Sequence, residues 1–274
     1  MCEIRNLENT SFEDLAAMWN LAYSDYIVPM HMTPEGMEAY IKVTGVDREQ
    51  SFGAFHNGAL VGALFNSIET FKGEAAAYDA MTGIAPEYRG NGLFSKLFEH
   101  TKDSLKTNGI TQYYLEVITT NERAYAIYKK KGGKVIRELS VLKGKMNRDF
   151  YTDAEVTVSP LSAFPKEELA QYELTFANRI AALHRNIEAY QVACAKAHGK
   201  KAAVIFRNGG SIPQIMWDGA GSKELLGAVF LYLSRNLESM NINNIPVTEF
   251  ELIKELRSIG FTVLVNQYEM CIEL

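Results

Sequence analysis

The alternation of apolar and polar positions in the first half of the chain predicts strands and helices in a mixed order. Apolar residues recur at helical spacing after Ser11 and again over Leu93–Lys106, where polar or glycine residues mark the helix ends. Extended apolar runs flank Asn57-Gly58, a pair that favours a tight β-hairpin turn. From residue 50 onward we expect three strands, a glycine-containing loop, a helix, a strand, a short helix and a strand. This order predicts an α/β (α+β) fold and disfavours a β-sandwich or a helical bundle.

The second half of the chain repeats this order more loosely. Its elements are expected as strands at Ala202–Phe206, Ile212–Trp217 and Phe261–Met270 and as helices from about Lys223 to Arg235 and near Glu249–Ser258. The segments around Gly132 and Gly260 both read as the end of a helix, a glycine and a strand. The sequence therefore predicts two related units, residues 1–147 and 148–274.

Composition and charge limit the compartment and the partners. The 274 residues are 47% hydrophobic and 22% charged, which is typical of globular proteins. A net charge of −5 disfavours a dedicated nucleic-acid binder. We find neither a signal peptide nor a membrane-spanning run, so we expect a cytoplasmic protein without membrane contact. Three scattered cysteines and five histidines without ligand spacing predict reduced thiols and no metal site.

The segment Ile84–Leu93 is the most informative for chemistry, because it joins a predicted strand to a predicted helix. Gly90 and Gly92 allow a tight turn after which the free N–H groups of the helix N-terminus face outward, an arrangement that binds phosphate. A turn that merely connects two elements is the simplest alternative. A dinucleotide fingerprint is disfavoured, since its third glycine is absent and four residues separate the strand from the loop.

The same segment resembles the acyl-CoA loop of the GNAT superfamily of N-acetyltransferases, which is often written V-x-P-x-x-R-G-x-G. The residues in register are Ile84, Pro86, Arg89, Gly90 and Gly92. The sequence departs from the family at Glu87, where Gln or Arg is usual, so the local charge is less basic. The resemblance implies that acetyl-CoA is bound by Ile84, Arg89, Gly90, Asn91, Gly92, Leu93 and Phe94.

A second segment, Asn121–Gly133, resembles the family's N-x-x-A-x-x-x-Y-x-K-x-G-F pattern, with Gly133 in place of the final Phe. The resemblance implies that Asn121 contacts the pantetheine arm and that Tyr128 protonates the departing CoA thiolate. Taken alone, Asn121 also suits a helix N-cap and Tyr128 a half-buried helix aromatic. The two motifs, in the family's order and on the expected elements, cover residues 1–146 as one unit.

The resemblance implies an acyl-CoA-dependent N-acetyltransferase in which a primary amine attacks the thioester directly. A backbone N–H near Thr82–Ile84 would stabilise the oxyanion. The attacking ammonium must first lose a proton, and Asp79 and Glu116 are the candidate bases because both lie on predicted strands beside the expected site. A structural role for either carboxylate stays open.

The implied fold has two GNAT-like units, each a mixed, mostly antiparallel twisted sheet flanked by helices. In the aligned second unit, Leu256 takes the place of Tyr128 and Glu249 that of Asn121. The second unit is therefore predicted to be a degenerate GNAT-like domain without catalysis, as in tandem members of the family.

The sequence leaves several alternatives open. The acceptor is a small-molecule or peptide amine, and pairing as a homodimer is undecided, because substrate loops vary among proteins of one fold. A non-catalytic acyl-CoA-binding or sensing module is the main alternative to an enzyme, and an interaction protein is a second. The presence of Tyr128 favours the enzyme, since sensing requires no acid for the thiolate.

Overall fold

The computed structural model describes residues 2–25, 31–146, 152–164 and 172–274. They divide into two compact units. Unit 1 comprises Met1–Glu116, Lys129–Lys134 and Met270–Leu274, and unit 2 comprises Val117–Tyr128 and Val135–Glu269. The predicted boundary at 147–148 lies outside the described residues, so the division at that point stays a prediction.

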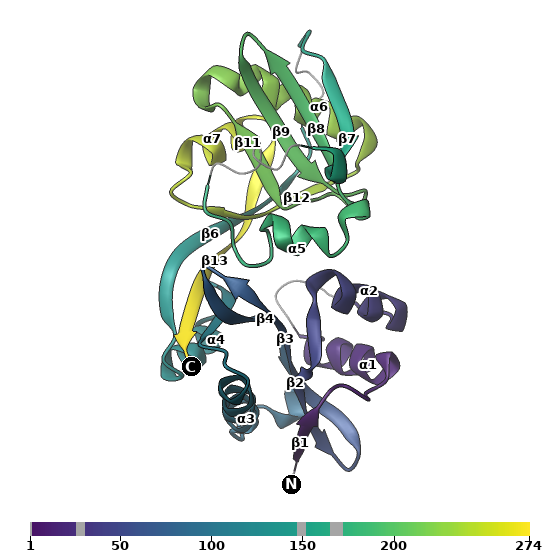
Figure 1. The fold of residues 1–274 in the computed structure, drawn as a ribbon, viewed down its shortest axis with the longest axis vertical. Coiled ribbons are helices and arrows are strands. Elements are labelled where there is room, and N and C mark those ends of the chain that lie inside the picture. The colour runs from purple at the N-terminus through teal and green to yellow at the C-terminus, as the bar shows by residue number, and fades with distance from the viewer. Residues whose placement is uncertain (1, 26–30, 147–151, 165–171) are drawn as a thin grey trace. The chain divides into compact units, whose positions relative to one another are not determined.

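Unit 1 is a twisted sheet with helices on both faces (Figure 1). Its elements are β1 (Glu3–Asn6), α1 (Phe12–Ala22), α2 (Pro34–Thr44), β2 (Val46–His56), β3 (Ala59–Phe71), β4 (Glu74–Ile84), the 3-10 turn η1 (Pro86–Tyr88), α3 (Leu93–Thr107) and β5 (Gln112–Ile118), of which the last two residues belong to unit 2. The strand order is β1-β2-β3-β4-β5. Neighbours are antiparallel up to β4, whereas β4 and β5 are parallel. The expected mixed, mostly antiparallel sheet is confirmed.

The helix starts and the hairpin form where the sequence predicts them. Ser11 accepts a hydrogen bond from the Asp14 N–H at 3.1 Å, and Thr33 accepts one from the Gly36 N–H at 3.0 Å. Each bond satisfies an N–H that the first helical turn leaves unpaired. Asn57 and Gly58 have φ values of 50° and 84°, as a two-residue β-hairpin turn requires.

The two faces of the sheet bury different sets of side chains. Helices α1 and α2 lie on one face and α3 on the other (Figure 1). On the first face, Trp19 of α1 and Phe65 of β3 belong to one core cluster. On the second, Phe98 of α3 packs against Tyr113 of β5 with ring centroids 5.4 Å apart. Helix α3 is therefore anchored on the strand that follows it, and its N-terminus is held at the end of β4.

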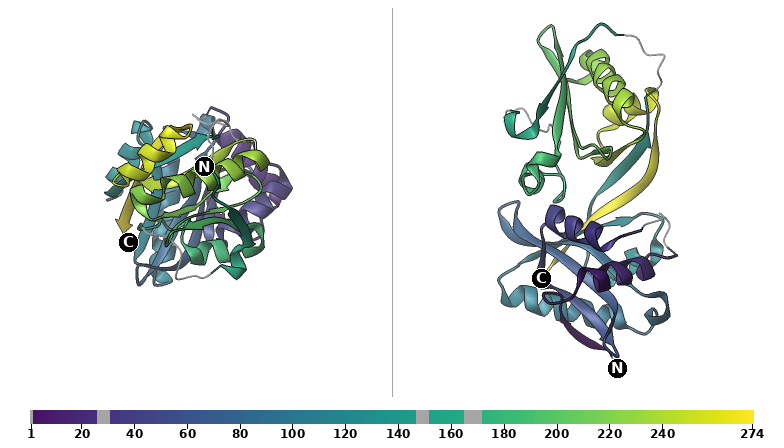
Figure 2. Two further views of the ribbon diagram at one scale, coloured as in Figure 1. Left: turned by 90° about the horizontal axis from the view of Figure 1, so that it is seen from above. Right: turned by 90° about the vertical axis from the view of Figure 1, so that its right-hand side faces the viewer.

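Unit 2 contains the remaining elements. They are most of α4 (Glu122–Lys130) and of β6 (Lys134–Gly144), then β7 (Val156–Pro160), η2 (Leu161–Ala163), α5 (Ile180–His184), η4 (Ile187–Ala189), β8 (Gln191–Ala197), β9 (Lys200–Phe206), β10 (Ser211–Ile212), β11 (Gln214–Trp217), η5 (Gly219–Ser222), α6 (Lys223–Asn236), β12 (Met240–Pro246), α7 (Phe250–Ser258) and most of β13 (Phe261–Glu273). Strands β11, β9, β8 and β7 form an antiparallel sheet in that order. Strands β13, β6, β12 and β10 are neighbours, in that order, in a different sheet. Helix α6 packs its apolar side on β8 and β9 (Figure 2).

The succession β11, η5, α6, β12, α7, β13 has the same element types as β4, η1, α3, β5, α4, β6. This agrees with the loose repeat read from the sequence. The single strand predicted over Ile212–Trp217 is wrong, however. Pro213 has no N–H to donate, and the chain forms two short strands there, β10 paired with β12 and β11 paired with β9.

Candidate active site

The candidate site is built on the edge of β4 that faces β5. The two strands pair only at Ala76–Tyr78 with Gln112–Tyr114, although both continue beyond these residues. Over the rest of β4, that edge therefore has no ladder to β5 in the described part of unit 1. An unpaired strand edge offers backbone N–H and C=O groups to a ligand or to another strand.

A β-bulge lies just where the pairing with β5 ends. On the β3 side, Met81 pairs with Phe65 and Asp79 with Asn66, so Ala80 is the extra residue of β4. A bulge bends a strand and re-aims the groups beside it, which is common next to active sites. The residues that follow, Thr82 and Ile84, lead from the bulge to the glycine loop.

Both predicted base candidates lie beside this bulge. The side chain of Asp79 is buried and accepts hydrogen bonds from the Thr82 hydroxyl at 2.7 and 2.8 Å. The half-buried carboxylate of Glu116 on β5 accepts a hydrogen bond from the Tyr78 hydroxyl. The structure therefore brings both carboxylates to the same part of unit 1, each held by a hydroxyl.

Two tyrosines near these carboxylates stay protonated. Burial raises the pKa of Tyr40, and the negative charges of Asp79 and Glu116 raise it further. The pKa of Tyr78 is raised well above its ordinary value by burial first and then by Glu116. Both hydroxyls are therefore hydrogen-bond donors throughout the neutral range. Neither tyrosine was singled out from the sequence, because each meets the site through contacts far apart along the chain.

The glycine loop is open and ends at a helix N-terminus. Gly90 and Gly92 have φ values of 82° and 73°, and an added Cβ at either position would meet no atom within 4 Å. Gly90, Asn91 and Gly92 are exposed. The first helical bond of α3 runs from the Lys96 N–H to the Gly92 carbonyl at 3.1 Å, so the N–H groups before Lys96 are outside the helical ladder. These exposed N–H groups at the positive end of a helix dipole suit a phosphate group.

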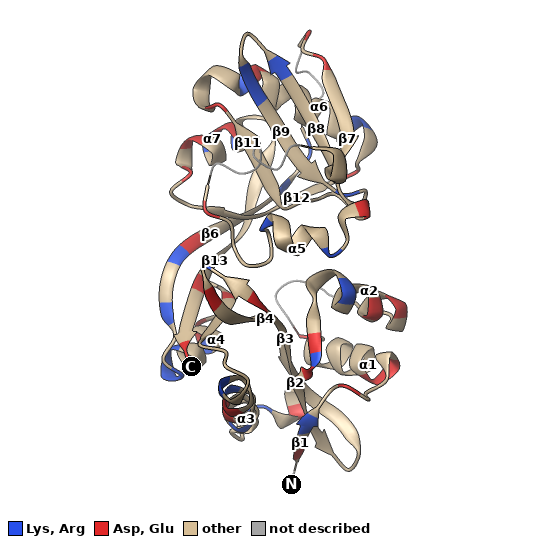
Figure 3. Ribbon diagram, viewed as in Figure 1, with Lys and Arg blue, Asp and Glu red and all other residues tan. Residues whose placement is uncertain are grey.

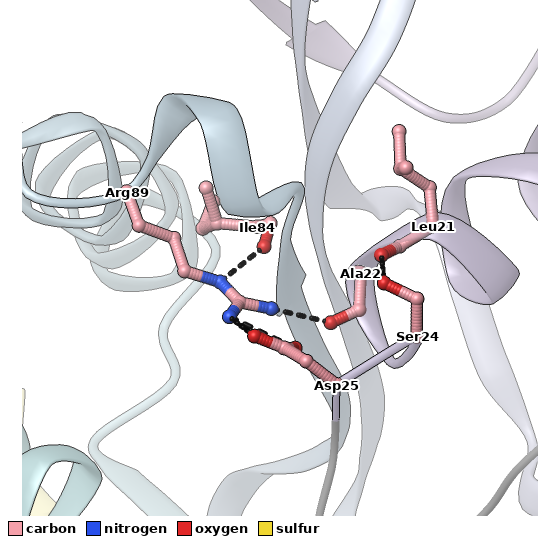
Figure 4. A network of polar contacts seen from close by, with 6 residues as sticks. All are labelled: Leu21, Ala22, Ser24, Asp25, Ile84 and Arg89. Carbon is pink, nitrogen blue, oxygen red and sulfur yellow. Dashed lines mark hydrogen bonds and ion pairs between the residues drawn. The ribbon is translucent and has the colours of Figure 1, made fainter.

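Arg89 fixes the start of this loop (Figure 4). Its guanidinium donates to the Ile84 carbonyl at 2.8 Å and to the Ala22 carbonyl at 2.6 Å. It also forms an ion pair with Asp25 at 2.7 Å. Arg89 thus ties the end of β4 to the end of α1. Direct contact of Arg89 with a cofactor stays a prediction, and the geometry supports a positioning role.

The second predicted motif lies mostly in unit 2. The Asn121 side-chain oxygen accepts a hydrogen bond from the Ala124 N–H at 3.1 Å, so it caps α4. Tyr128 is buried on the same helix. Just beyond α4, Lys131 forms an ion pair with Glu99 of α3 at 2.9 Å within unit 1. The structure thus groups the glycine loop, Asp79 and Glu116 in unit 1, and Asn121 and Tyr128 in unit 2.

Other features of the described residues lie outside this site. A pocket of about 410 Å³ in unit 2 is lined by Ser140, Val247, Phe250, Ile253, Lys254 and Arg257, none of which is a predicted site residue.

The described residues contain no cluster of His, Cys, Asp and Glu suited to a metal ion. None of their helices is both long and apolar enough to cross a bilayer. Acidic and basic residues are interspersed along α3 (Figure 3).

We expect the hydrogen bonds of Arg89 to the two carbonyls to contribute more to the free energy of unfolding than its ion pair with Asp25. Arg89→Lys should lower the free energy of unfolding by about 1–3 kcal/mol, because one ammonium cannot reach all the acceptors of the guanidinium fork. Asp25→Asn should lower it by less than about 1 kcal/mol, since a solvent-exposed ion pair contributes little. Urea unfolding of both variants measures the difference. Equal losses would show that the ion pair, and not the carbonyl contacts, holds the loop.

Comparison with known proteins places this geometry in a family. The sequence model of the acetyltransferase (GNAT) family matches residues 6–133. The chain is 34% identical over 85 residues to a protein of Schizosaccharomyces pombe named N-alpha-acetyltransferase 30, a match that covers 31% of this chain and 57% of that protein. The matched region thus spans just over half the length of this curated relative.

Solved structures of low sequence identity share the fold. A GCN5-related N-acetyltransferase from Sphaerobacter thermophilus has a TM-score of 0.69 at 14% identity, covering 99% of this chain and 95% of that one. A tandem GNAT protein from the clavulanic acid biosynthesis pathway has a TM-score of 0.65 at 13% identity, covering 100% and 98%. Residues 6–133 of this chain therefore match the acetyltransferase (GNAT) family in sequence, and the chain shares the fold of these solved structures.

Proposed function

We propose that the protein is an acyl-CoA-dependent N-acetyltransferase that transfers an acetyl group from acetyl-CoA to a primary amine. The observation that carries the proposal is the open edge of β4, which is joined through η1 to the exposed glycine loop at the N-terminus of α3. One elongated ligand with amide groups and a pyrophosphate suits both features together.

The residues of unit 1 fit acetyl-CoA as a substrate. The exposed backbone of Gly90, Asn91 and Gly92, with the first N–H groups of α3 at Leu93 and Phe94, would hold the pyrophosphate. The N–H groups on the free edge of β4 would donate hydrogen bonds to carbonyl oxygens of the pantetheine arm. Asn121 is proposed to contact the same arm, a role that rests on its place in the second motif.

In the proposed reaction, the amine nitrogen forms a bond to the acetyl carbon and the carbon–sulfur bond breaks. The ammonium proton goes to a base, for which Glu116 is better suited than Asp79. Glu116 is half-buried, whereas Asp79 is 9% exposed and held at both oxygens by Thr82. The thiolate takes a proton from the Tyr128 hydroxyl. An N–H of β4 near Thr82–Ile84 would stabilise the oxyanion.

The acceptor class is proposed from the relative's name. The curated relative is an N-alpha-acetyltransferase, so a peptide α-amino group is the first acceptor to examine, with small-molecule amines as the alternative. A panel containing both kinds of amine, monitored by thiol release from acetyl-CoA, tests the activity. Binding of CoA without turnover of any amine would favour the non-catalytic binding protein.

We assign no catalysis to the predicted second GNAT-like domain, residues 148–274. The position aligned with Tyr128 is Leu256, which is fully buried, and Glu249 at the start of α7 makes no side-chain cap. In the turn before α6, the Lys200 side chain lies over Gly221, where an added Cβ would be 1.7 Å from its ammonium nitrogen, whereas Gly219 is as open as Gly90 and Gly92. These differences support a tandem chain with one active half.

Replacing Tyr128 tests the proposed acid. Tyr128→Phe should lower kcat by about 100-fold or more, because a positioned general acid contributes about 10²–10⁴-fold. The Kd for CoA should change little. Tyr125→Phe on the same helix is the matched control, since Tyr125 packs on Tyr268 and holds no proposed catalytic role. An unchanged kcat in Tyr128→Phe would rule out the acid role.

The charge around the glycine loop should tune CoA affinity in both directions. Glu87 is exposed at η1, so Glu87→Gln removes a charge that repels phosphate, and Asn91→Asp adds one inside the loop. We expect Kd to fall by about 2–5-fold in the first and rise at least as much in the second, with both effects smaller at high salt.

Calorimetric titration with CoA measures these shifts, and Glu13→Gln on α1 is the control for net charge. The same titration should give one CoA per chain. Binding of two CoA molecules per chain, or a Kd that stays unchanged in both loop variants, would contradict the placement of the phosphates.

A further inference from the structure

Three backbone carbonyls on the free edge of β4 are already occupied by side chains. The acceptors are the carbonyls of Ala80, Thr82 and Ile84. Their donors are the Tyr40 hydroxyl to Ala80, the Tyr23 hydroxyl to Thr82 at 2.7 Å and the Arg89 Nε to Ile84 at 2.8 Å. The donors come from α2, the end of α1 and the glycine loop. Three separate segments thus converge on the same short piece of strand.

The alternation of an antiparallel strand shows which edge these carbonyls occupy. The Ala85 N–H donates to the Val61 carbonyl of β3 at 2.9 Å, so residue 85 faces β3. Successive residues of a strand direct their backbone groups to opposite edges, and the N–H and C=O of one residue share an edge. Thr82 and Ile84 therefore direct both groups away from β3, to the edge that β5 leaves after Tyr78.

The side-chain contacts change what this edge can bind. An ordinary free edge presents N–H donors and C=O acceptors in turn, and it pairs with any strand of matching register. Here the acceptors are satisfied, and the N–H groups of Thr82 and Ile84 remain as donors. Such an edge offers its free N–H groups to carbonyl oxygens. Each of its three carbonyls already accepts one hydrogen bond, so a partner strand's N–H groups would have to share these acceptors.

The two tyrosines are held firmly enough to keep this pattern. Trp19 stacks on Tyr23 with ring centroids 4.8 Å apart, and it meets the ring of Tyr40 edge-on at 5.5 Å. Trp19 itself is buried in the core between α1, α2 and the sheet. A rigid aromatic group thus positions both hydroxyls against β4, and ordering them costs little further entropy when a ligand binds.

From this geometry we infer that Tyr23 and Tyr40 are positioning residues that make the β4 edge a row of donors selective for the carbonyl oxygen of the acyl group. The inference rests on the proposed function and deepens it. Neither tyrosine touches the reacting atoms. Each acts through the β4 carbonyl that it occupies, and its loss would leave that carbonyl oxygen without its donor beside the acyl oxygen, where it disfavours a second acceptor.

Two unreactive CoA thioethers whose sulfur substituents have the same number of carbon atoms test this selectivity. One carries an S-acetonyl group, which keeps a carbonyl, and the other an S-propyl group, which has none. Calorimetry should show that the unsubstituted protein binds the acetonyl compound at least about 10-fold more tightly, as expected for hydrogen bonds of about 1.5 kcal/mol net. In Tyr23→Phe and Tyr40→Phe this ratio should fall by about 3–10-fold, while Tyr232→Phe on α6 keeps it.

The outcomes separate this inference from the proposed function. A protein that binds neither thioether overturns both. A protein that binds both equally, or variants that keep the full ratio, overturn the inference and leave CoA binding intact. A general loss of stability would weaken both thioethers together and would leave the ratio unchanged, so the ratio distinguishes positioning from folding. Because Tyr23 is only half-buried, we expect Tyr23→Phe to fold. This variant alone then decides the test if Tyr40→Phe does not fold.

Discussion

The backbone hydrogen bonding of β4 is the constraint on which the rest of the site depends. One edge of this strand is paired with β3 along its whole length, and the other is paired with β5 over three residues only. Backbone polar groups near a protein core must find partners. The free edge therefore requires side chains, a ligand or another strand, and the structure supplies side chains for the carbonyls. The remaining donors give the site its chemical character.

This constraint also links segments that are distant along the chain. Tyr23 directly follows helix α1, the last residue of the helix accepts a hydrogen bond from Arg89, and Arg89 in turn fixes the loop before α3. A Cβ added to Gly83 would lie 2.8 Å from the Ala22 methyl, so α1 packs directly on β4. The strand edge, the glycine loop and the helix that covers the sheet therefore form one connected set of contacts. Changes at the end of α1 are expected to reach the loop through Arg89.

Local signals in the sequence predicted much of this arrangement. The Ser11 and Thr33 caps, the Asn57-Gly58 turn and the open glycine loop all depend on residues a few positions apart. The contacts of Tyr23 and Tyr40 with β4 bridge 59 and 40 residues, and no short pattern records them. The resemblance to the GNAT loop implies that Arg89 binds the cofactor, because the sequence does not show that Ile84, Ala22 and Asp25 already occupy its donors.

Irregularity accounts for one strand of unit 2 that the sequence did not predict, β12. The register of β12 shifts between Ile242 and Ile245, and Asn244 has a φ of 57° there, which breaks the alternation that identifies a strand. The succession of elements could be predicted because helix periodicity and glycine stops are local. The membership of β6 and β13 in their units could not, because strand pairing is set by contacts far apart in the sequence.

Hydrogen exchange of the β4 amides is the most direct test of the account. Measured residue by residue, the N–H groups of Thr82 and Ile84 should exchange slowly only when the S-acetonyl thioether of CoA is bound. The Ala85 N–H, bonded to β3, should be protected with or without the ligand. Protection of Thr82 and Ile84 that appears on binding is the result the account predicts. Exchange at these two amides that is the same with and without saturating ligand would contradict it.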